Sequence, residues 1–204
     1  MKPFAMKRVK QLLLLFFASS LFSFATIQAT AQNASEPVLL TSCGQSPGPV
    51  RLKIFLQKNN IAFDYNLQAR ADDLIAKKTA GKPYKSIIIV TGASLKGMGA
   101  AGVSMDDEIT RTKALIAEAK KQGIKIIGSH IEGMARRSQG ASAGDNTDEM
   151  SIDAVCNVCD LMIVKKEGDS DGRFTEISKA KNIPLILFEM NTEIEGVLKK
   201  VYNK

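Results

Sequence analysis

The 204-residue sequence contains no tryptophan, only three cysteines and a single histidine. Three cysteines are too few for a four-cysteine zinc site. Aromatic residues make up only 6% of the chain and lysines are spread along it, so the sequence lacks the clustered basic and aromatic residues of a nucleic-acid-binding surface. We therefore expect no bound metal, no cofactor and no nucleic-acid partner.

The first 31 residues contain no acidic side chain. Four basic residues come first, an apolar run from Leu12 to Ile27 follows, and Ala29-Thr30-Ala31 resembles a signal-peptidase site. The apolar run is short for a membrane span, so we interpret 1–31 as a signal peptide cleaved near Ala31 rather than as an anchor. We expect an exported protein, periplasmic or secreted, that has no membrane contact after cleavage.

A second segment, Leu40-Thr41-Ser42-Cys43, resembles the lipobox of bacterial lipoproteins. A lipobox closes the apolar run of its own leader, whereas residues 32–37 separate the two here. We therefore interpret Val38-Leu39-Leu40 as the start of a strand. Residues 32–204 hold 24 basic and 21 acidic side chains, and their length suits a single α/β domain.

Six short apolar runs alternate with helical stretches in this domain. They are Val38–Thr41, Ile61–Tyr65, Ser86–Thr91, Ile124–Gly128, Leu161–Val164 and Pro184–Phe188. Continuous Ile, Val and Leu in the central runs indicates strands covered on both faces. We expect an α/β fold with a single doubly wound, mainly parallel sheet of five to six strands and helices on both faces. Such a three-layer α/β/α domain is flavodoxin-like or Rossmann-like, with its ligand crevice between the first and third strands.

Several residues mark helix boundaries. Pro49 suits a first helical turn, and Gly123 suits the end of the long helix before the fourth strand. We expect the helix N-caps at Ser104, Asn146 and Thr192. Right-handed crossovers then place all the turns that follow the strands on one edge of the sheet.

The most conspicuous of these turns is the glycine-rich segment 91–102. It contains the pattern G-x-G-x-x-G at residues 97–102, but several residues after the third strand, whereas a dinucleotide fingerprint directly follows the first. The next helix opens with Asp106-Asp107-Glu108, which would repel a phosphate. We expect either a long flexible loop or one wall of a pocket for a polar ligand, with contacts from Thr91, Gly92, Ser94 and Lys96.

The turn after the first strand has the opposite charge pattern. Its helix begins without an acidic residue and carries Arg51 and Lys53. Backbone N–H groups there suit a carboxylate or phosphate at the helix N-terminus. We expect this anion site to be formed by Gly44, Gln45, Ser46 and Gly48, the alternative being a turn stiffened by proline and glycine.

Cys43 precedes that turn, and a thiol at a helix N-terminus is a candidate nucleophile. The strand-Cys-loop-helix order resembles low-molecular-weight protein tyrosine phosphatases. That family needs an arginine six residues after its cysteine, where this chain has Pro49, so a buried thiol remains the other interpretation. Cys156 and Cys159 form a C-x-x-C pair at the opposite edge, which we interpret as a local disulfide or two buried thiols.

His130 ends the fourth strand and is followed by Glu132 and by two arginines, Arg136 and Arg137. This position on the predicted binding edge suits a general base or a ligand contact, while a lone histidine also suits a structural position. The arginines suit an anionic ligand or a solvated surface. The small residues from Gly133 to Gly144 suggest a lid or a long loop.

Three segments together resemble a bacterial exported family known only as a domain of unknown function. They are Val38–Gly48, Thr91–Gly99 and Gly128–Gly133. The resemblance covers nearly all of residues 32–204 and implies a flavodoxin- or Rossmann-like core. It implies no activity and no catalytic residue.

These observations favour a protein that binds a small polar or anionic molecule at the C-terminal edge of its sheet. One alternative is a hydrolase that uses His130 with Glu132, or Cys43. Another is a module whose loops bind a protein partner of unknown identity. Binding of a ligand, an enzymatic reaction and binding of a protein all remain compatible with the sequence.

Overall fold

The computed structural model describes residues 33–137 and 146–204, and residues 34–204 form one compact unit. The expected leader and most of the expected lid lie outside the described residues. None of the helices in the described ranges is long and apolar enough to cross a membrane.

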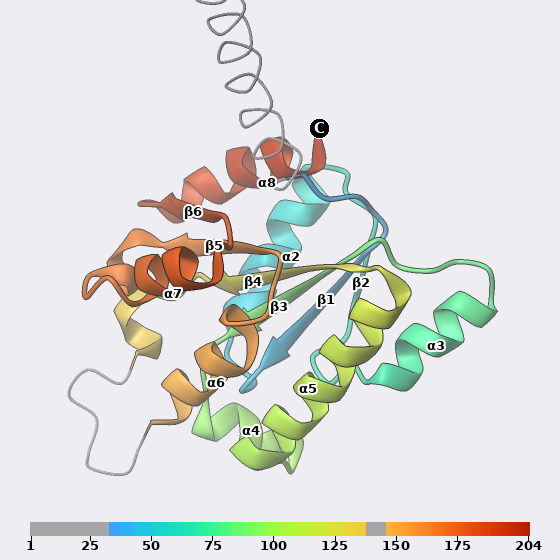
Figure 1. Ribbon diagram of the computed structural model, residues 1–204, viewed down its shortest axis with the longest axis horizontal. Helices are drawn as coiled ribbons and strands as arrows, with labels where there is room; N and C mark the ends of the chain where they lie inside the picture. Colours follow the sequence, from blue (N-terminus) through green and yellow to red (C-terminus); the bar gives the residue numbers. More distant parts are fainter. Residues whose placement is uncertain (1–32, 138–145) are drawn as a thin grey trace, which may run out of the picture. The chain divides into compact units, whose positions relative to one another are not determined.

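A six-stranded, all-parallel sheet forms the centre of this unit (Figure 1). The strand order is β2-β1-β3-β4-β5-β6, which confirms the doubly wound α/β fold. The strands are β1 (Val38–Cys43), β2 (Phe63–Tyr65), β3 (Ser86–Thr91), β4 (Lys125–His130), β5 (Leu161–Lys165) and β6 (Leu185–Phe188). Because β1 lies between β2 and β3, the order reverses between the first and third strands, as predicted.

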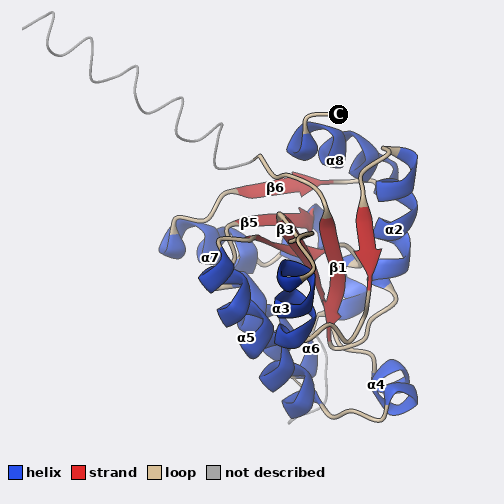
Figure 2. Ribbon diagram, turned by 90° about the vertical axis from the view of Figure 1, so that its right-hand side faces the viewer, coloured by secondary structure: helices blue, strands red, loops and turns tan. Residues whose placement is uncertain are grey.

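Helices cover both faces of the sheet, as Figure 2 shows. One face carries α2 (Gly48–Lys58) and α8 (Ile194–Tyr202), and the other carries α3 (Ala71–Thr79), α5 (Met105–Gln122), α6 (Thr147–Cys156) and α7 (Arg173–Lys181). The remaining elements are α4 (Leu95–Ala101) and the short 3-10 helices η1 (Gly133–Arg136), η2 (Lys166–Asp169) and η3 (Asn191–Glu193).

The core lies in two layers, one on each face, because successive strand residues point to opposite sides. In β3, Ile87 and Ile89 pack with the α3, α5, α6 and α7 layer, whereas Ile88 and Val90 pack with the α2 and α8 layer. Each of these side chains is almost completely buried, and such burial stabilises the fold by roughly 1.5–3 kcal/mol per side chain. The continuous apolar runs therefore reflect coverage on both faces.

Most helix boundaries agree with the sequence. Pro49 lies in the first turn of α2, and the hydroxyl of Ser104 accepts a hydrogen bond from the backbone of Asp107 at the start of α5. Gly123 ends α5 in the left-handed conformation that favours glycine. The N-cap at Thr192 is wrong, because that residue lies within η3 and α8 begins two residues later.

The glycine-rich segment is a short helix rather than a flexible loop. Ser94 caps α4 by accepting a hydrogen bond from the backbone of Gly97, and Gly102 ends it with a positive φ. A Cβ atom on Gly97 would lie 2.3 Å from the carbonyl oxygen of Gln45. Glycine is needed at this position because α4 lies directly against the loop that follows β1.

Candidate functional site

The loops after β1, β3 and β4 meet at the C-terminal edge of the sheet. The backbone of Ser94 donates a hydrogen bond to the carbonyl oxygen of Gly44 at 2.7 Å, which joins the first two loops. The backbone of Gly48 donates to the carboxylate of Glu132 at 3.2 Å, which joins the first and third. The segments 44–48 and 130–137 therefore share one edge, as the sequence predicts.

A carboxylate of the protein itself occupies part of the predicted anion site. Glu108, which is fully buried, accepts hydrogen bonds from the backbone of Gly44 at 2.8 Å and from the side-chain amide of Gln45 at 3.0 Å. The guanidinium of Arg111 pairs with the same carboxylate at 2.9 Å. The backbone N–H of Gly44, which was expected to hold a ligand anion, thus already has an anionic partner, as does the side-chain amide of Gln45.

Arg111 ties this carboxylate to the surrounding backbone. Its side chain also donates to the carbonyl oxygens of Ser42 at the end of β1 and Ala69 before α3. With its side chain 4% exposed, it forms a buried ion pair with Glu108 that has further hydrogen bonds on both partners. The pair fixes α5 against β1 and the β2–α3 loop.

From the sequence, Glu108 is predicted only as one of three acids in the first turn of a helix. The signal that identifies it is the helical spacing, because Glu108 and Arg111 share the buried face of α5 with Met105, Leu115 and Ala119. Two opposite charges three residues apart on an apolar stripe indicate a buried ion pair. Asp106 and Asp107 on the other face are exposed.

Two backbone donors of the turn after β3 also have partners within the protein. The carboxylate of Asp148 accepts from the backbone of Ala93 at 2.6 Å, and the hydroxyl of Ser151 accepts from the backbone of Gly92 at 2.9 Å. Ser151 in turn donates to the carbonyl oxygen of Cys43 at 2.6 Å. Helix α6 therefore supplies the polar groups that close the turn after β3.

The two candidate arginines face inward. Arg136 donates to the carbonyl oxygen of Ala93 at 2.8 Å and lies 3.8 Å from Glu132. Arg137 is almost completely buried and pairs with Glu149 and Asp171, each at 2.7 Å. Both guanidinium groups connect parts of the fold in this structure rather than facing solvent.

His130 is fully buried beneath the edge. Its Nδ1 lies 3.1 Å from the hydroxyl of Thr91, and its Nε2 lies 3.0 Å from the carbonyl oxygen of Gly133. Burial lowers the pKa of the imidazole below its usual value, which favours the neutral ring. Since both ring nitrogens have partners, His130 has no free nitrogen for a substrate in this conformation.

All three cysteines are buried free thiols. Burial raises the pKa of Cys43, so the thiolate that a nucleophile requires is disfavoured. Cys156 and Cys159 lie at the opposite edge, where α6 ends and β5 follows. They are two buried thiols in this structure, which is one of the two arrangements expected for them.

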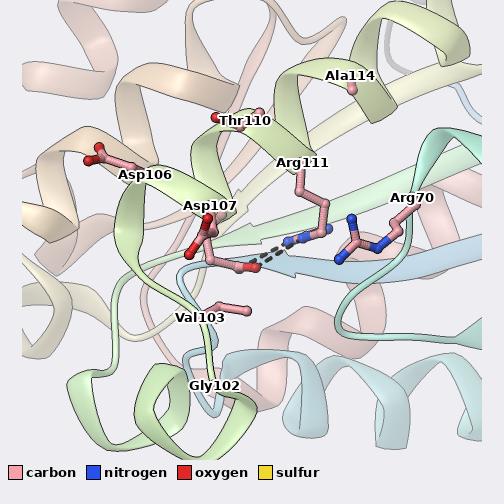
Figure 3. Close-up of a pocket in the computed structure, with 9 residues that line it drawn as sticks. Arg70, Gly102, Val103, Asp106, Asp107, Thr110, Arg111 and Ala114 are labelled. Carbon is pink, nitrogen blue, oxygen red and sulfur yellow. Dashed lines mark hydrogen bonds and ion pairs between the residues drawn. The ribbon is translucent and has the colours of Figure 1, made fainter.

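Beside the edge, a groove of about 540 Å³ lies between the start of α5 and the β2–α3 loop. Figure 3 shows the side chain of Arg70 pointing toward Arg111, whose own guanidinium is directed at the carboxylate of Glu108, while Asp106 points away from both arginines. The lining residues are Arg70, Gly102, Val103, Asp106, Asp107, Glu108, Thr110, Arg111 and Ala114. This groove was not predicted, because its walls come from segments far apart in the sequence.

None of the eleven predicted ligand contacts lines this groove. Lys96 is exposed on α4, Ser94 caps that helix, and Ser46 is buried in the β1–α2 loop. The described residues contain no cluster of three or more histidine, cysteine or acidic side chains suited to a metal ion.

One protein-family model matches almost all of the described domain. The family described as "Domain of unknown function (DUF6305)" matches residues 35–202. The chain belongs to this family. The DUF6305 domain therefore extends from just before β1 to the end of α8, and no curated protein matches the chain.

Solved structures with a related arrangement include two hydrolases. The psychrotrophic esterase EstA from Pseudoalteromonas sp. is 11% identical, with 82% of this chain and 96% of that chain covered and a TM-score of 0.36. A GDSL-like lipase from Bacteroides thetaiotaomicron VPI-5482 is 13% identical, with 81% and 77% covered and a TM-score of 0.32. Similarity at this level assigns no activity to the DUF6305 chain.

Proposed function

We propose that this protein binds a small polar molecule carrying an anionic group, in the groove between α5 and the β2–α3 loop. The observation that carries the proposal is Arg70, an exposed guanidinium at the mouth of the groove that forms no ion pair with any described residue. Arg111, Arg136, Arg137 and Arg173 all pair with carboxylates.

The size and position of the groove support this proposal. Its volume of about 540 Å³ lies within the range of small-molecule sites. It lies beside the C-terminal edge of a doubly wound sheet, the edge at which such folds bind ligands. The planar fork of an arginine suits a carboxylate or phosphate, which supports a ligand whose anionic group faces Arg70.

The opposite wall restricts the rest of the ligand. Asp107 is ionised, because its hydrogen bonds from Ser104 lower its carboxyl pKa, and the hydroxyl-bearing Thr110 lies one turn along α5. A second anionic group placed against this wall would be repelled. We therefore propose a ligand with a single anionic group and neutral hydroxyl or cationic ammonium groups, rather than a polyanion.

The geometry supports binding better than catalysis. The hydrolase alternative needs an accessible base or nucleophile, whereas Cys43 and His130 are fully buried and Glu132 already accepts a hydrogen bond from Gly48. A binding function requires no rearrangement of this network.

Thermal unfolding with a panel of small anions tests the proposal. The panel contains monocarboxylates, hydroxy acids, amino acids, inorganic phosphate and sugar phosphates. We expect at least one member to raise Tm, and Arg70→Ala to abolish the increase while Arg70→Lys retains part of it. Arg51→Ala, which removes an exposed arginine from α2, is the matched control. An equal increase in Tm for the Arg70→Ala variant would contradict the groove as the binding site.

We also propose export, with removal of residues 1–31, on the basis of the basic head, apolar run and Ala29-Thr30-Ala31. N-terminal sequencing of the protein recovered from the producing bacterium tests it. A mature chain beginning at Gln32 is expected, and recovery of an intact N-terminus would contradict it.

A further inference from the structure

The C-x-x-C pair is a second chemically distinctive feature, away from the groove. Cys156 is the last residue of α6, and Cys159 follows one turn later. The backbones of Val158 and Cys159 both donate to the carbonyl oxygen of Val155, so the helical turn continues past the end of α6. Residues three apart on such a turn have Cα atoms about 5 Å apart, within the range of disulfides.

The sulfur atoms of this pair converge on one position of the sheet. A Cβ atom on Gly128 of β4 would lie 3.2 Å from the sulfur of Cys159 and 3.5 Å from the sulfur of Cys156. Both sulfurs therefore occupy the space that a side chain at residue 128 would fill. The thiol of Cys159 also donates to the carbonyl oxygen of Cys156 at 3.6 Å, so it lies close to the backbone of its partner residue.

From this juxtaposition we infer that Cys156 and Cys159 are a modification site, which closes to a local disulfide when the chain folds in the presence of a low-molecular-weight disulfide. The structure shows the reduced form of the pair. This inference does not depend on the ligand groove.

The reaction is thiol–disulfide exchange in two steps. The thiolate of one cysteine attacks the donor disulfide, which forms a mixed disulfide and releases one donor thiol. The second cysteine then attacks the protein sulfur of the mixed disulfide and releases the other donor thiol. The pair loses two hydrogens and gains one S–S bond, while the donor is reduced to two thiols.

The surroundings suit a permanent disulfide rather than a redox centre. Both sulfurs are buried at the end of a helix, where neither burial nor the helix dipole favours a thiolate. Exchange must therefore precede burial, and the closed disulfide is shielded from thiols in solution. Cys43 lies in β1, two strands away from β4, and is not expected to join the pair.

Refolding of the reduced full chain in a mixture of oxidised and reduced glutathione tests this inference. After denaturation and alkylation, we expect one modified thiol instead of three, a mass lower by two hydrogen atoms before alkylation, and a peptide map that links Cys156 to Cys159. Once folded, the protein should keep the disulfide in a mild reductant that reduces the denatured chain.

Two variants separate the alternatives. Cys43→Ser should form the same disulfide and leave no alkylated thiol, whereas Cys156→Ser should form no intramolecular disulfide. Three alkylated thiols in the refolded wild-type chain, a stable glutathione adduct or a bond that includes Cys43 would each overturn the inference. Should Cys43→Ser fail to fold, the peptide map of the wild-type chain still decides the pairing.

Discussion

The carboxylate of Glu108 accepts a hydrogen bond from the backbone of Gly44 at 2.8 Å, although 64 residues separate them in the chain. This contact places a negative charge of the protein at the loop where the sequence predicts an external anion. A side chain of the protein therefore holds the loop after β1, and the groove between α5 and the β2–α3 loop lies beside it.

Removal of that charge should destabilise the protein. We expect Glu108→Ala to lower the free energy of unfolding by about 3–5 kcal/mol, because Arg111 is left buried without its partner. Glu108→Gln, which keeps an acceptor for Gly44, should lose less. Urea unfolding measures both, with Asp106→Ala on the exposed face of α5 as control. A loss below about 1 kcal/mol for Glu108→Ala would contradict a buried pair.

The two neighbouring arginines should differ in their effect on stability. Arg137→Ala should lower the free energy of unfolding by about 2–4 kcal/mol, because it removes an ion-pair partner from the partly buried carboxylates of Glu149 and Asp171. Arg136→Ala removes one hydrogen bond and a longer ion pair, so about 1 kcal/mol is expected. Equal losses in the free energy of unfolding, measured by chemical denaturation, would contradict a larger contribution from the buried Arg137.

Two glycines of α4 provide a matched comparison. Gly97→Ala should destabilise by about 1–3 kcal/mol, because its Cβ would meet the carbonyl oxygen of Gln45 at 2.3 Å. Gly99→Ala has open space around its Cβ and should stabilise by about 0.5–1 kcal/mol through helix propensity. Thermal unfolding checks both signs. Stabilisation by Gly97→Ala would contradict the close packing of α4 on the β1–α2 loop.

His130 should make stability depend on pH below neutrality. Burial lowers its pKa in the folded state below the usual 6.5, so the unfolded chain binds the proton more tightly. Stability is therefore full above about pH 6.5 and falls as the pH drops toward the lowered folded value.

We expect this loss between pH 7.5 and 5.5 in urea unfolding of the wild-type chain, and a smaller one in His130→Gln. Charges from several elements act on the ring, with Arg137 opposing and Glu132 and Glu149 favouring its protonation. The carboxyl groups of Asp64 and Asp171 have lowered pKa values and affect stability only at more acidic pH. An unchanged pH dependence in His130→Gln would exclude the imidazole as its source.

The sequence determined the fold class because burial on two faces gives the central strands continuous apolar sequences. The continuous runs in β1 and β3, with helical stretches between them, predict a parallel doubly wound sheet before any contact is known. Local signals such as Pro49, Ser104 and Gly123 located helix ends for the same reason, since each acts through its immediate backbone neighbours.

The candidate site depended on contacts that only the tertiary structure decides. The sequence placed Gly44, Gly92, His130 and the two arginines on one edge, but it could not show that Glu108, Asp148 and Ser151 occupy the backbone donors there. Whether a charged side chain faces a ligand or a partner depends on how α5 and α6 pack against the strands. The position of Arg70 in a groove also depends on tertiary packing, because the residues of the opposite wall lie more than 30 residues away in the chain.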